Sequence, residues 1–220
     1  MDAILRGALE VLADLVGRQR CAGCDGETRR RTAFCSVCVT TLVRASNPDP
    51  ERTAAFVYGG AIAQAVKRLK FDDRPDLAPL LLAGFAAHLP RLRTSTLVVP
   101  VPLHPSRLVE RGYNQAALLA RPLADLLEIR CAARALARPL ATARQTELSR
   151  GARGVNVRHA FVANEPGLLA GEVVLLVDDV ETTGATLAAC RTALLSGGAR
   201  AVHSLVVART AGVMDGVEGG

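Results

Sequence analysis

The chain has 220 residues, of which 50% are hydrophobic and only 3% aromatic, and its formal net charge is +6. This length and hydrophobic content predict one main domain with a core of ordinary size and a small appendage. The low aromatic content, with no Trp, argues against a surface on which several bases stack on aromatic side chains. No uncharged apolar run reaches the length of about 18 residues needed to cross a bilayer, so we expect a cytoplasmic protein with reduced cysteines.

Residues 1–16 carry apolar side chains at helical spacing and are predicted to form a helix. Asp2, Glu10 and Asp14 interrupt the segment, no basic stretch precedes it, and no small-residue cleavage site follows a continuous apolar core. We therefore do not interpret this helix as a signal peptide.

Two Cys-x-x-Cys pairs follow, Cys21 with Cys24 and Cys35 with Cys38, with ten residues between them. Each pair can chelate a metal ion from one tight turn, and four thiolates suit the tetrahedral coordination of Zn²⁺. Disulfide bonds are the alternative, which a reducing compartment and the short loops disfavour. Closed sites of four cysteines are structural, so we expect zinc to hold the module together and to do no chemistry.

Residues 47–50, Asn-Pro-Asp-Pro, are typical of a turn-rich linker. They predict a boundary between an N-terminal helix and zinc-finger module, residues 1–50, and a main domain, residues 51–220. The next predicted elements are a strand at residues 53–58, a helix at residues 60–71 and a second helix at residues 77–89.

Three basic side chains, Lys67, Arg68 and Lys70, stand near the end of the first of these helices. They could reach a phosphate group, but a solvated helix face is the more common meaning of such residues. We therefore assign them to no site.

Residues 96–103 are typical of another buried strand, which prolines end. A loop at residues 103–114 and a predicted helix at residues 115–127 come next, so strands and helices alternate as in a parallel α/β sheet. Ligands of such sheets bind beyond the carboxyl ends of the strands. His104 is interpreted as a loop residue rather than as a base, because no acid nearby in the sequence orients it. The side chains of this loop that are placed to receive an anionic ligand are Arg107, Arg111 and Asn114.

Seven arginines stand between residues 130 and 158 against one acid, Glu147, and this excess equals the whole net charge. Such a block favours an anionic substrate, although a path for nucleic acid has the same pattern. Residues 144–156 contain Gly151 and Gly154 and suit a lid that closes over a reacting centre; a surface linker is the alternative. We expect the lid to act through Arg144, Arg150 and Arg153, and the better candidates for contacts with DNA are Arg130, Arg134 and Arg138.

Residues 173–177 are a run of Val and Leu, the pattern of a strand buried on both faces, and Asp178 and Asp179 follow directly. Small residues then lead into a predicted helix at residues 185–195. The free N–H groups of such a loop suit a phosphate, and two carboxylates can accept hydrogen bonds from a vicinal diol. Phosphate beside diol describes a ribose 5-phosphate; the alternative is a junction whose aspartates only cap the helix. The loop residues are Thr182, Thr183, Gly184, Ala185 and Thr186.

Glu181 is an unexpected neighbour for a bound phosphate. A carboxylate about 5 Å from the phosphate would be repelled by about 3 kcal/mol per unit charge at an effective dielectric constant of about 20. We therefore expect Glu181 to point away or to pair with an arginine.

Residues 174–186 resemble the phosphoribosyl pyrophosphate (PRPP) signature of type I phosphoribosyltransferases, which has four apolar residues, two acids and small residues around a Thr-Gly. The resemblance implies a parallel sheet of about five strands with helices on both faces, which a strand predicted at residues 201–208 would complete. It also implies that Asp178 and Asp179 hold the ribose hydroxyls and that the loop holds the 5-phosphate. Thr182 stands where purine-salvage members carry an aspartate, which argues against that subclass.

Other segments are similar to the ComF (ComFC-like) family, in which a phosphoribosyltransferase-like domain follows a zinc finger: the cysteine pairs, residues 100–115 (PVPLHPSRLVERGYNQ) and residues 144–161 (RQTELSRGARGVNVRHAF). That family is associated in transformable bacteria with uptake of single-stranded DNA. The resemblance implies displacement of pyrophosphate from Mg²⁺-bound PRPP by an acceptor that the sequence does not identify, with Arg107 and Arg111 neutralising the pyrophosphate. The alternative is an accessory protein that handles single-stranded DNA and keeps the PRPP site as a sensor or a relic.

Overall fold

The computed structural model describes residues 20–28, 32–85, 88–92, 94–139 and 160–211. The predicted helix at residues 1–16 and the predicted lid at residues 144–156, with Arg144, Arg150 and Arg153, lie outside the described residues.

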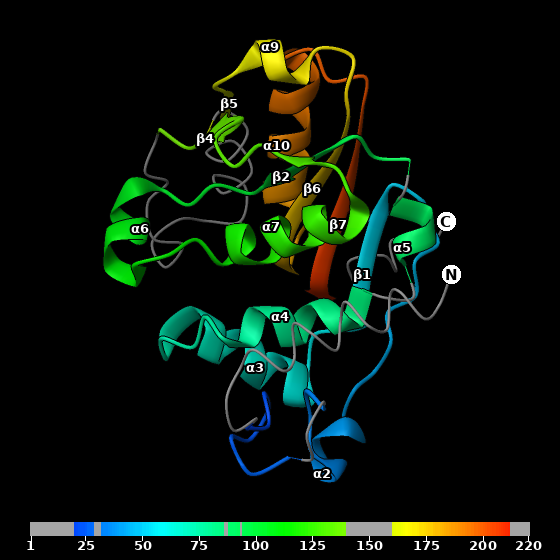
Figure 1. The fold of residues 1–220 in the computed structure, drawn as a ribbon, viewed down its shortest axis with the longest axis vertical. Coiled ribbons are helices and arrows are strands. Elements are labelled where there is room, and N and C mark those ends of the chain that lie inside the picture. Colours follow the sequence, from blue (N-terminus) through cyan, green and yellow to red (C-terminus); the bar gives the residue numbers. More distant parts are fainter. Residues whose placement is uncertain (1–19, 29–31, 86–87, 93, 140–159, 212–220) are drawn as a thin grey trace, which may run out of the picture.

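Five strands form the central sheet, in the spatial order β1 (Arg52–Val57), β7 (Ala201–Arg209), β6 (Val173–Glu181), β2 (Leu97–Pro100) and β3 (Arg130–Cys131) (Figure 1). Each neighbouring pair is parallel. The predicted fold class, a parallel sheet of about five strands flanked by helices behind a small module with four cysteines, is confirmed.

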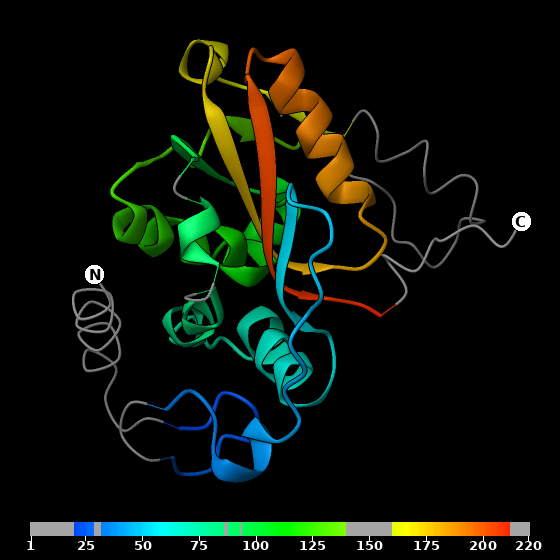
Figure 2. The ribbon, with the colours of Figure 1, turned by 90° about the vertical axis from the view of Figure 1, so that its right-hand side faces the viewer.

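Helices cover both faces of the sheet: α3 (Gly60–Phe71), α4 (Leu77–Leu82) and α7 (Gln115–Leu127) pack on one face, and α10 (Ala185–Ser196) packs on the other (Figure 2). Side chains alternate along a strand, which divides β6 between two hydrophobic clusters. Leu175 and Val177 join the cluster under α3, α4 and α7, whereas Val174 and Leu176 join the cluster under α10. β6 is therefore the buried centre of the fold.

Small elements complete the architecture. The antiparallel pair β4 (Leu136–Ala137) and β5 (Val162–Ala163) contacts α10 on its face of the sheet. Two short helices are α2 (Ser36–Val39), in the cysteine module, and α9 (Pro166–Leu169), before β6.

The single helix predicted at residues 77–89 is wrong, because the structure breaks it into α4, the 3₁₀ turn η1 (Ala83–Phe85) and α5 (Leu89–Leu92). Gly84 packs so closely on β1 that an added Cβ would lie 2.4 Å from a ring carbon of Phe56. Its carbonyl oxygen also accepts a hydrogen bond from the Arg44 guanidinium, at 3.0 Å. Contacts from a distant segment, together with the poor helix propensity of glycine, therefore end α4 early.

A short helix, α6 (Pro105–Arg111), replaces most of the loop predicted at residues 103–114. Its signals are local: His104 is the N-cap, Pro105 occupies the first turn and Gly112 ends the helix in the left-handed conformation, with φ of 80°. The prediction of a loop here is wrong, because the proline and the glycine are in the positions that typically bound a helix.

The cysteine module is docked on the main domain rather than tethered beside it (Figure 2). Ala22, between the first two cysteines, is fully buried and belongs to the hydrophobic cluster of α3, α4 and α7. Thr41 accepts a hydrogen bond at Oγ1 from the backbone N–H of Ala61, at 2.9 Å, and so satisfies a free donor at the start of α3. The module and α3 are thus joined by packing and by hydrogen bonding.

Candidate functional site

The acidic pair lies where two neighbouring strands separate. β2 and β6 pair as far as Pro100 and Val177, and beyond that point β6 continues beside β7 alone. The helices that follow the two strands, α7 and α10, lie on opposite faces of the sheet. Such a switch point opens a crevice at the carboxyl ends of the strands, which is where ligands of parallel sheets bind.

Both carboxyl groups of the pair are buried. Asp178 is 8% exposed and Asp179 2% exposed, and each accepts a hydrogen bond at Oδ1 from the N–H of the next residue, at 2.9 Å. Burial raises the pKa of Asp178 well above its usual range, the nearby charge of Asp179 raises it further, and the Lys70 ammonium group opposes the shift. The pair is therefore a desolvated acidic centre that a hydrogen-bond donor or a cation would relieve.

Lys70 compensates the second acid. Its Nζ lies 2.7 Å from Asp179 Oδ2, and the lysine side chain is only 22% exposed. Arg68, on the same helix, forms an ion pair with Asp25 of the cysteine module at 3.6 Å. The sequence interpretation of these two side chains as a solvated helix face is wrong for both, whereas Lys67 is exposed as that interpretation expects.

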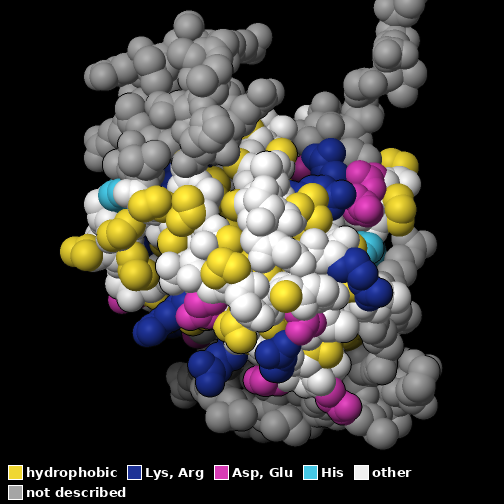
Figure 3. Space-filling view, turned by 90° about the horizontal axis from the view of Figure 1, so that it is seen from above, with side chains coloured by type: hydrophobic (Ala, Val, Ile, Leu, Met, Phe, Trp, Pro, Cys, Tyr) yellow, Lys and Arg dark blue, Asp and Glu magenta, His cyan; other side chains and the backbone are white. Residues whose placement is uncertain are grey.

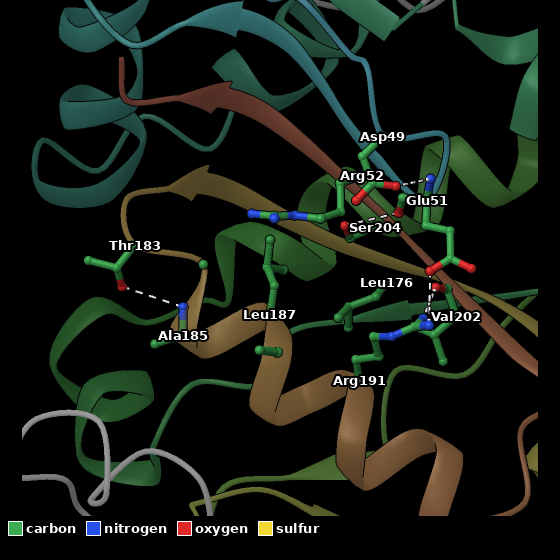
Figure 4. Close-up of a pocket in the computed structure, with 12 residues that line it drawn as sticks. Asp49, Glu51, Arg52, Leu176, Thr183, Ala185, Leu187, Arg191, Val202 and Ser204 are labelled. Carbon is green, nitrogen blue, oxygen red and sulfur yellow. Dashed lines mark hydrogen bonds and ion pairs between the residues drawn. The ribbon is translucent and has the colours of Figure 1, made fainter. Parts of the chain in front are cut away.

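The loop after β6 places a helix N-terminus against β1. Gly184 is the N-cap of α10 with φ of 76°, a left-handed conformation that favours glycine, and Thr183 Oγ1 accepts a hydrogen bond from the N–H of Ala185, at 3.4 Å (Figure 4). Arg52 extends from β1 toward this loop: a Cβ added at Gly184 would lie 3.0 Å from the arginine Nη2. No motif in the sequence assigns Arg52 to the site, because the arginine reaches the loop only through the pairing of β1 with β7.

Glu181 pairs with arginines, as expected. Its buried carboxylate forms ion pairs with Arg52 Nη2 and with Arg209 Nε, the second at 2.5 Å. Arg209 is itself buried and donates a further hydrogen bond to the carbonyl oxygen of Arg52, at 3.0 Å. The negative charge beside the loop is therefore neutralised by cations from β1 and β7.

A cavity of about 340 Å³ lies between α10 and the edge of the sheet (Figure 4). Thr183, Gly184 and Ala185 line one end of it, and the Glu51–Arg191 ion pair, at 2.9 Å, lines the other. The acidic pair does not line this cavity. The loop therefore borders the cavity, whereas the acidic pair lies outside it on β6.

The predicted pyrophosphate-binding residues divide into two kinds. Arg107 and Arg111 lie on α6 and line a second cleft together with Lys70. Arg107 forms an ion pair with Glu110 at 2.7 Å, whereas Arg111 donates to the Gln115 side chain. Asn114 instead holds the backbone: it caps α7 by accepting from the Ala116 N–H at 3.0 Å and donates to the Val101 carbonyl at 3.0 Å. His104 caps α6 by accepting from the Ser106 N–H at Nδ1, at 3.2 Å.

The described arginines of the basic block differ in their surroundings. Arg130 pairs with Glu172, Arg134 is exposed, and Arg138 is half-buried with its guanidinium carbon 5.2 Å from the centre of the Phe161 ring. Burial lowers the pKa of Arg138, and the charges of Cys190 and Asp178 oppose this lowering. Among the described residues on the face shown in Figure 3, basic side chains lie next to acidic ones.

The four cysteines of the N-terminal module converge, with their Sγ atoms all within 4.8 Å of one another and no disulfide among them. Cys24 Sγ and Cys35 Sγ are 3.7 Å apart. Zn–S bonds of about 2.3 Å in a tetrahedron give S–S edges of about 3.8 Å, so the four thiolates could hold a zinc ion. Although burial alone would raise the pKa of Cys21, backbone N–H donors from Cys24, Cys35 and Gly23 lower it to about 6. Burial and the neighbouring thiols raise the pKa of Cys38, which favours a shared cation over four isolated thiolates.

Within the part of the chain that the structure describes, no helix is both long and apolar enough to cross a membrane.

Comparison with known proteins gives relatives along most of the chain. The chain is 31% identical over 206 residues to the DNA utilization protein YhgH of Escherichia coli K12, covering 86% of this chain and 90% of the relative. It is 30% identical over 177 residues to competence protein F of Haemophilus influenzae, covering 76% and 74%, and 27% identical over 184 residues to competence protein ComFC of Bacillus subtilis, covering 81% and 73%. No family model matches the chain.

Among solved structures, the glutamine PRPP amidotransferase from B. subtilis complexed with ADP and GMP matches with a TM-score of 0.40 and 21% identity. The match covers 64% of this chain and 30% of that one. By its similarity to the relatives named above, the chain belongs to the ComF family, with competence protein F, ComFC and the DNA utilization protein YhgH.

Proposed function

We propose that this protein binds PRPP at the carboxyl ends of β6 and β2 and transfers its phosphoribosyl group to an acceptor. One observation carries the proposal: a buried pair of carboxyl groups, Asp178 and Asp179, leads through a short loop directly to the N-terminus of a twelve-residue helix. The carboxylates on β6 could accept hydrogen bonds from a diol, and the N–H groups at the start of α10 could donate to a phosphate. Only a few residues separate these two sets of groups.

The acidic pair would bind the ribose. A vicinal diol donates two hydrogen bonds, which two desolvated carboxylates accept strongly because charge-assisted bonds gain in a low dielectric. Burial raises the pKa of Asp178, whereas hydrogen bonds donated by a diol would favour its ionised form and so lower that pKa when the ligand binds.

The loop residues, Thr182 to Thr186, would bind the 5-phosphate. The first N–H groups of α10 have no partner within the helix, and the helix dipole favours an anion there. Gly184 lets the backbone approach the phosphate without a Cβ, and Arg52 adds positive charge next to the loop. The pairing of Glu181 with Arg52 and Arg209 supports the proposal, because it removes the repulsion that a free carboxylate would exert.

Pyrophosphate would lie toward α6, where Arg107 and Arg111 line the adjoining cleft. In the transfer, the bond between the anomeric carbon and the pyrophosphate oxygen breaks, a bond to the acceptor forms, and pyrophosphate leaves with the electron pair. Mg²⁺ bound with PRPP would supply further positive charge for the leaving pyrophosphate, beside Arg107 and Arg111. We propose that Arg144, Arg150 and Arg153 contribute when residues 144–156 cover the site.

The zinc proposed for the cysteine module is structural. With four thiolate ligands it has no open position for a substrate, and its binding free energy would contribute to folding of the module.

Binding of Mg²⁺·PRPP, measured by isothermal titration calorimetry and by the rise in Tm, tests the site. Replacing Asp178 and Asp179 together by Asn removes two charge-assisted acceptors, each worth about 1.5–3 kcal/mol, so affinity should fall at least about 100-fold. Asp125→Asn, at an exposed position of α7, is the matched control and should bind like the parent. Unchanged affinity in a folded double variant would refute the proposal. Pyrophosphate release across a panel of nucleobases then identifies the acceptor.

A second candidate function is the handling of single-stranded DNA; the name of one relative, DNA utilization protein, supports a role connected with DNA. If the arginine block contacts about three to six phosphates, affinity should fall with salt at a log–log slope of about −2 to −4, since each single-strand phosphate contributes about 0.7. Such binding should survive substitution of the acidic pair and weaken in Arg134→Ala. Absence of salt-dependent DNA binding in zinc-loaded protein would exclude this candidate.

A further inference from the structure

A second cleft lies beside the acidic pair, between the end of α3 and α6. Its volume is about 540 Å³, within the range of small-molecule sites. Lys70, which pairs with Asp179, belongs to its lining, so the cleft adjoins the acidic pair through a single side chain. Asp73, Arg107, Glu110 and Arg111 add hydrogen-bond donors and acceptors to its walls.

Phe71 gives this cleft an aromatic surface. It is the last residue of α3, and its side chain is 70% exposed, whereas Phe56, Phe85 and Phe161 are buried. The Arg111 guanidinium carbon lies 5.3 Å from the centre of the Phe71 ring. An exposed aromatic ring offers a flat surface of the kind on which nucleobases stack.

Contacts with neighbouring elements hold the end of α3 in place. Tyr113 Oη donates to the carbonyl oxygen of Leu69 at 2.5 Å, tying the chain after α6 to the end of α3. Lys70 ties the same turn of α3 to β6. Val109, 86% exposed, adds apolar surface to the cleft, and Figure 3 shows hydrophobic side chains gathered on the side of the molecule where α6 lies. The backbone of α3 next to Phe71 is therefore held by the chain after α6 and by β6.

We propose that a planar nucleobase binds in this cleft by stacking on the exposed ring of Phe71, beside the pyrophosphate that Arg107 and Arg111 would hold. The inference deepens the proposed function and rests on it for the role of the base, which would be presented to the anomeric carbon of PRPP held at Asp178 and Asp179. The chemistry is that of a flat heterocycle with polar edges, supplied by a free base or nucleoside or by one base of a single strand.

Fluorescence quenching of 2-aminopurine, which stacking produces, tests this directly, and the absence of Trp keeps the protein background low. The first arm uses 2-aminopurine riboside and the second a single-stranded oligonucleotide with one 2-aminopurine. Each is titrated into zinc-loaded parent protein, Phe71→Leu, Phe71→Tyr and Leu195→Ala, the last an exposed apolar control on α10. Phe71→Leu keeps the apolar character and removes only the ring.

Affinity in one or both arms should fall about 5- to 100-fold in Phe71→Leu, since stacking contributes about 1–3 kcal/mol per base, and should be retained in Phe71→Tyr and Leu195→Ala. The arm that shows the loss identifies the source of the base. Equal affinity of Phe71→Leu and parent, or no quenching in either arm, would overturn the inference.

Titration of Mg²⁺·PRPP into the same variants separates this inference from the proposed function. PRPP affinity should fall much less than base affinity in Phe71→Leu, because the ring contacts Arg111 of the proposed pyrophosphate site but none of the residues proposed for the ribose or the 5-phosphate. A parent that fails to bind PRPP but shows Phe71-dependent quenching would refute PRPP binding and leave the base site standing.

Discussion

Lys70, at the end of α3, and Asp179, near the end of β6, form an ion pair with 2.7 Å between Nζ and Oδ2. At its other end α3 accepts the contacts of the cysteine module, through Thr41 and Ala22. One helix of twelve residues therefore connects the cysteine cluster with the acidic pair.

Replacing Lys70 by Met should destabilise the protein by about 1–3 kcal/mol, because a buried carboxylate loses its cation. The cost is below that of a fully buried pair, since the lysine is partly exposed. Urea unfolding measures it, with Lys67→Met, an exposed position on the same helix, as the control. Equal stability of the two variants would show that the ion pair contributes nothing.

Replacing Glu181 by Gln should cost about 3–5 kcal/mol, since it leaves the buried Arg209 guanidinium without its counter-charge. Glu51→Gln breaks the exposed pair with Arg191 and should cost less than about 1 kcal/mol. Denaturant midpoints of the two variants, compared with the parent, decide the point. A small effect at Glu181 would mean that water reaches Arg209 when the partner is neutral.

Stability should fall as pH rises above about 4, through the contribution of Asp178. Its pKa is raised in the folded state, so the folded protein holds a proton that the unfolded chain has already released, and raising the pH favours unfolding until the folded-state pKa is passed. Asp178→Asn has no carboxyl group to ionise at this position, so the difference in unfolding free energy, variant minus parent, should increase with pH. Unfolding curves between pH 5 and 8 that run parallel for the two proteins would contradict the assignment.

Metal removal should act beyond the cysteine module. Purified protein should contain about one zinc per chain, and Cys24→Ser should lose it and lower the Tm. Because α3 contacts the cysteine module and contains Lys70, loss of the metal should also lower the affinity for Mg²⁺·PRPP. Calorimetry on protein that is still folded measures this affinity. Cys131→Ser, outside the cluster, is the control and should keep both metal and affinity. Full PRPP affinity in the metal-free variant would show that the two sites are independent.

Local signals were enough to predict much of the fold. The helices at residues 60–71 and 115–127 were predicted at the bounds that the structure has, because their apolar spacing and flanking residues agree. The acidic pair and its loop were found for a similar reason: strand, acids and small residues are contiguous in the sequence. The roles proposed for these residues stay predictions.

Other features depend on contacts that sequence periodicity does not contain. The break after α4 follows from the approach of Phe56 to Gly84. Lys70 and Asp179 form an ion pair although they are far apart in the sequence. Phe71 ends α3, and only folding brings it beside Arg111 of α6. Side chains that meet only after folding were therefore the part of the site that sequence reasoning missed.

The position of β7 between β1 and β6 has a consequence for how the chain folds during synthesis. Arg209 bonds to the Arg52 backbone across 157 residues of sequence, and β1 gains its place in the sheet only through β7. Such non-local pairing forms slowly, and β1 cannot pair in the sheet until β7 has left the ribosome. Until then Glu181 lacks Arg209 and one edge of β6 is unpaired, so a nascent chain carries its acidic pair without a finished site around it.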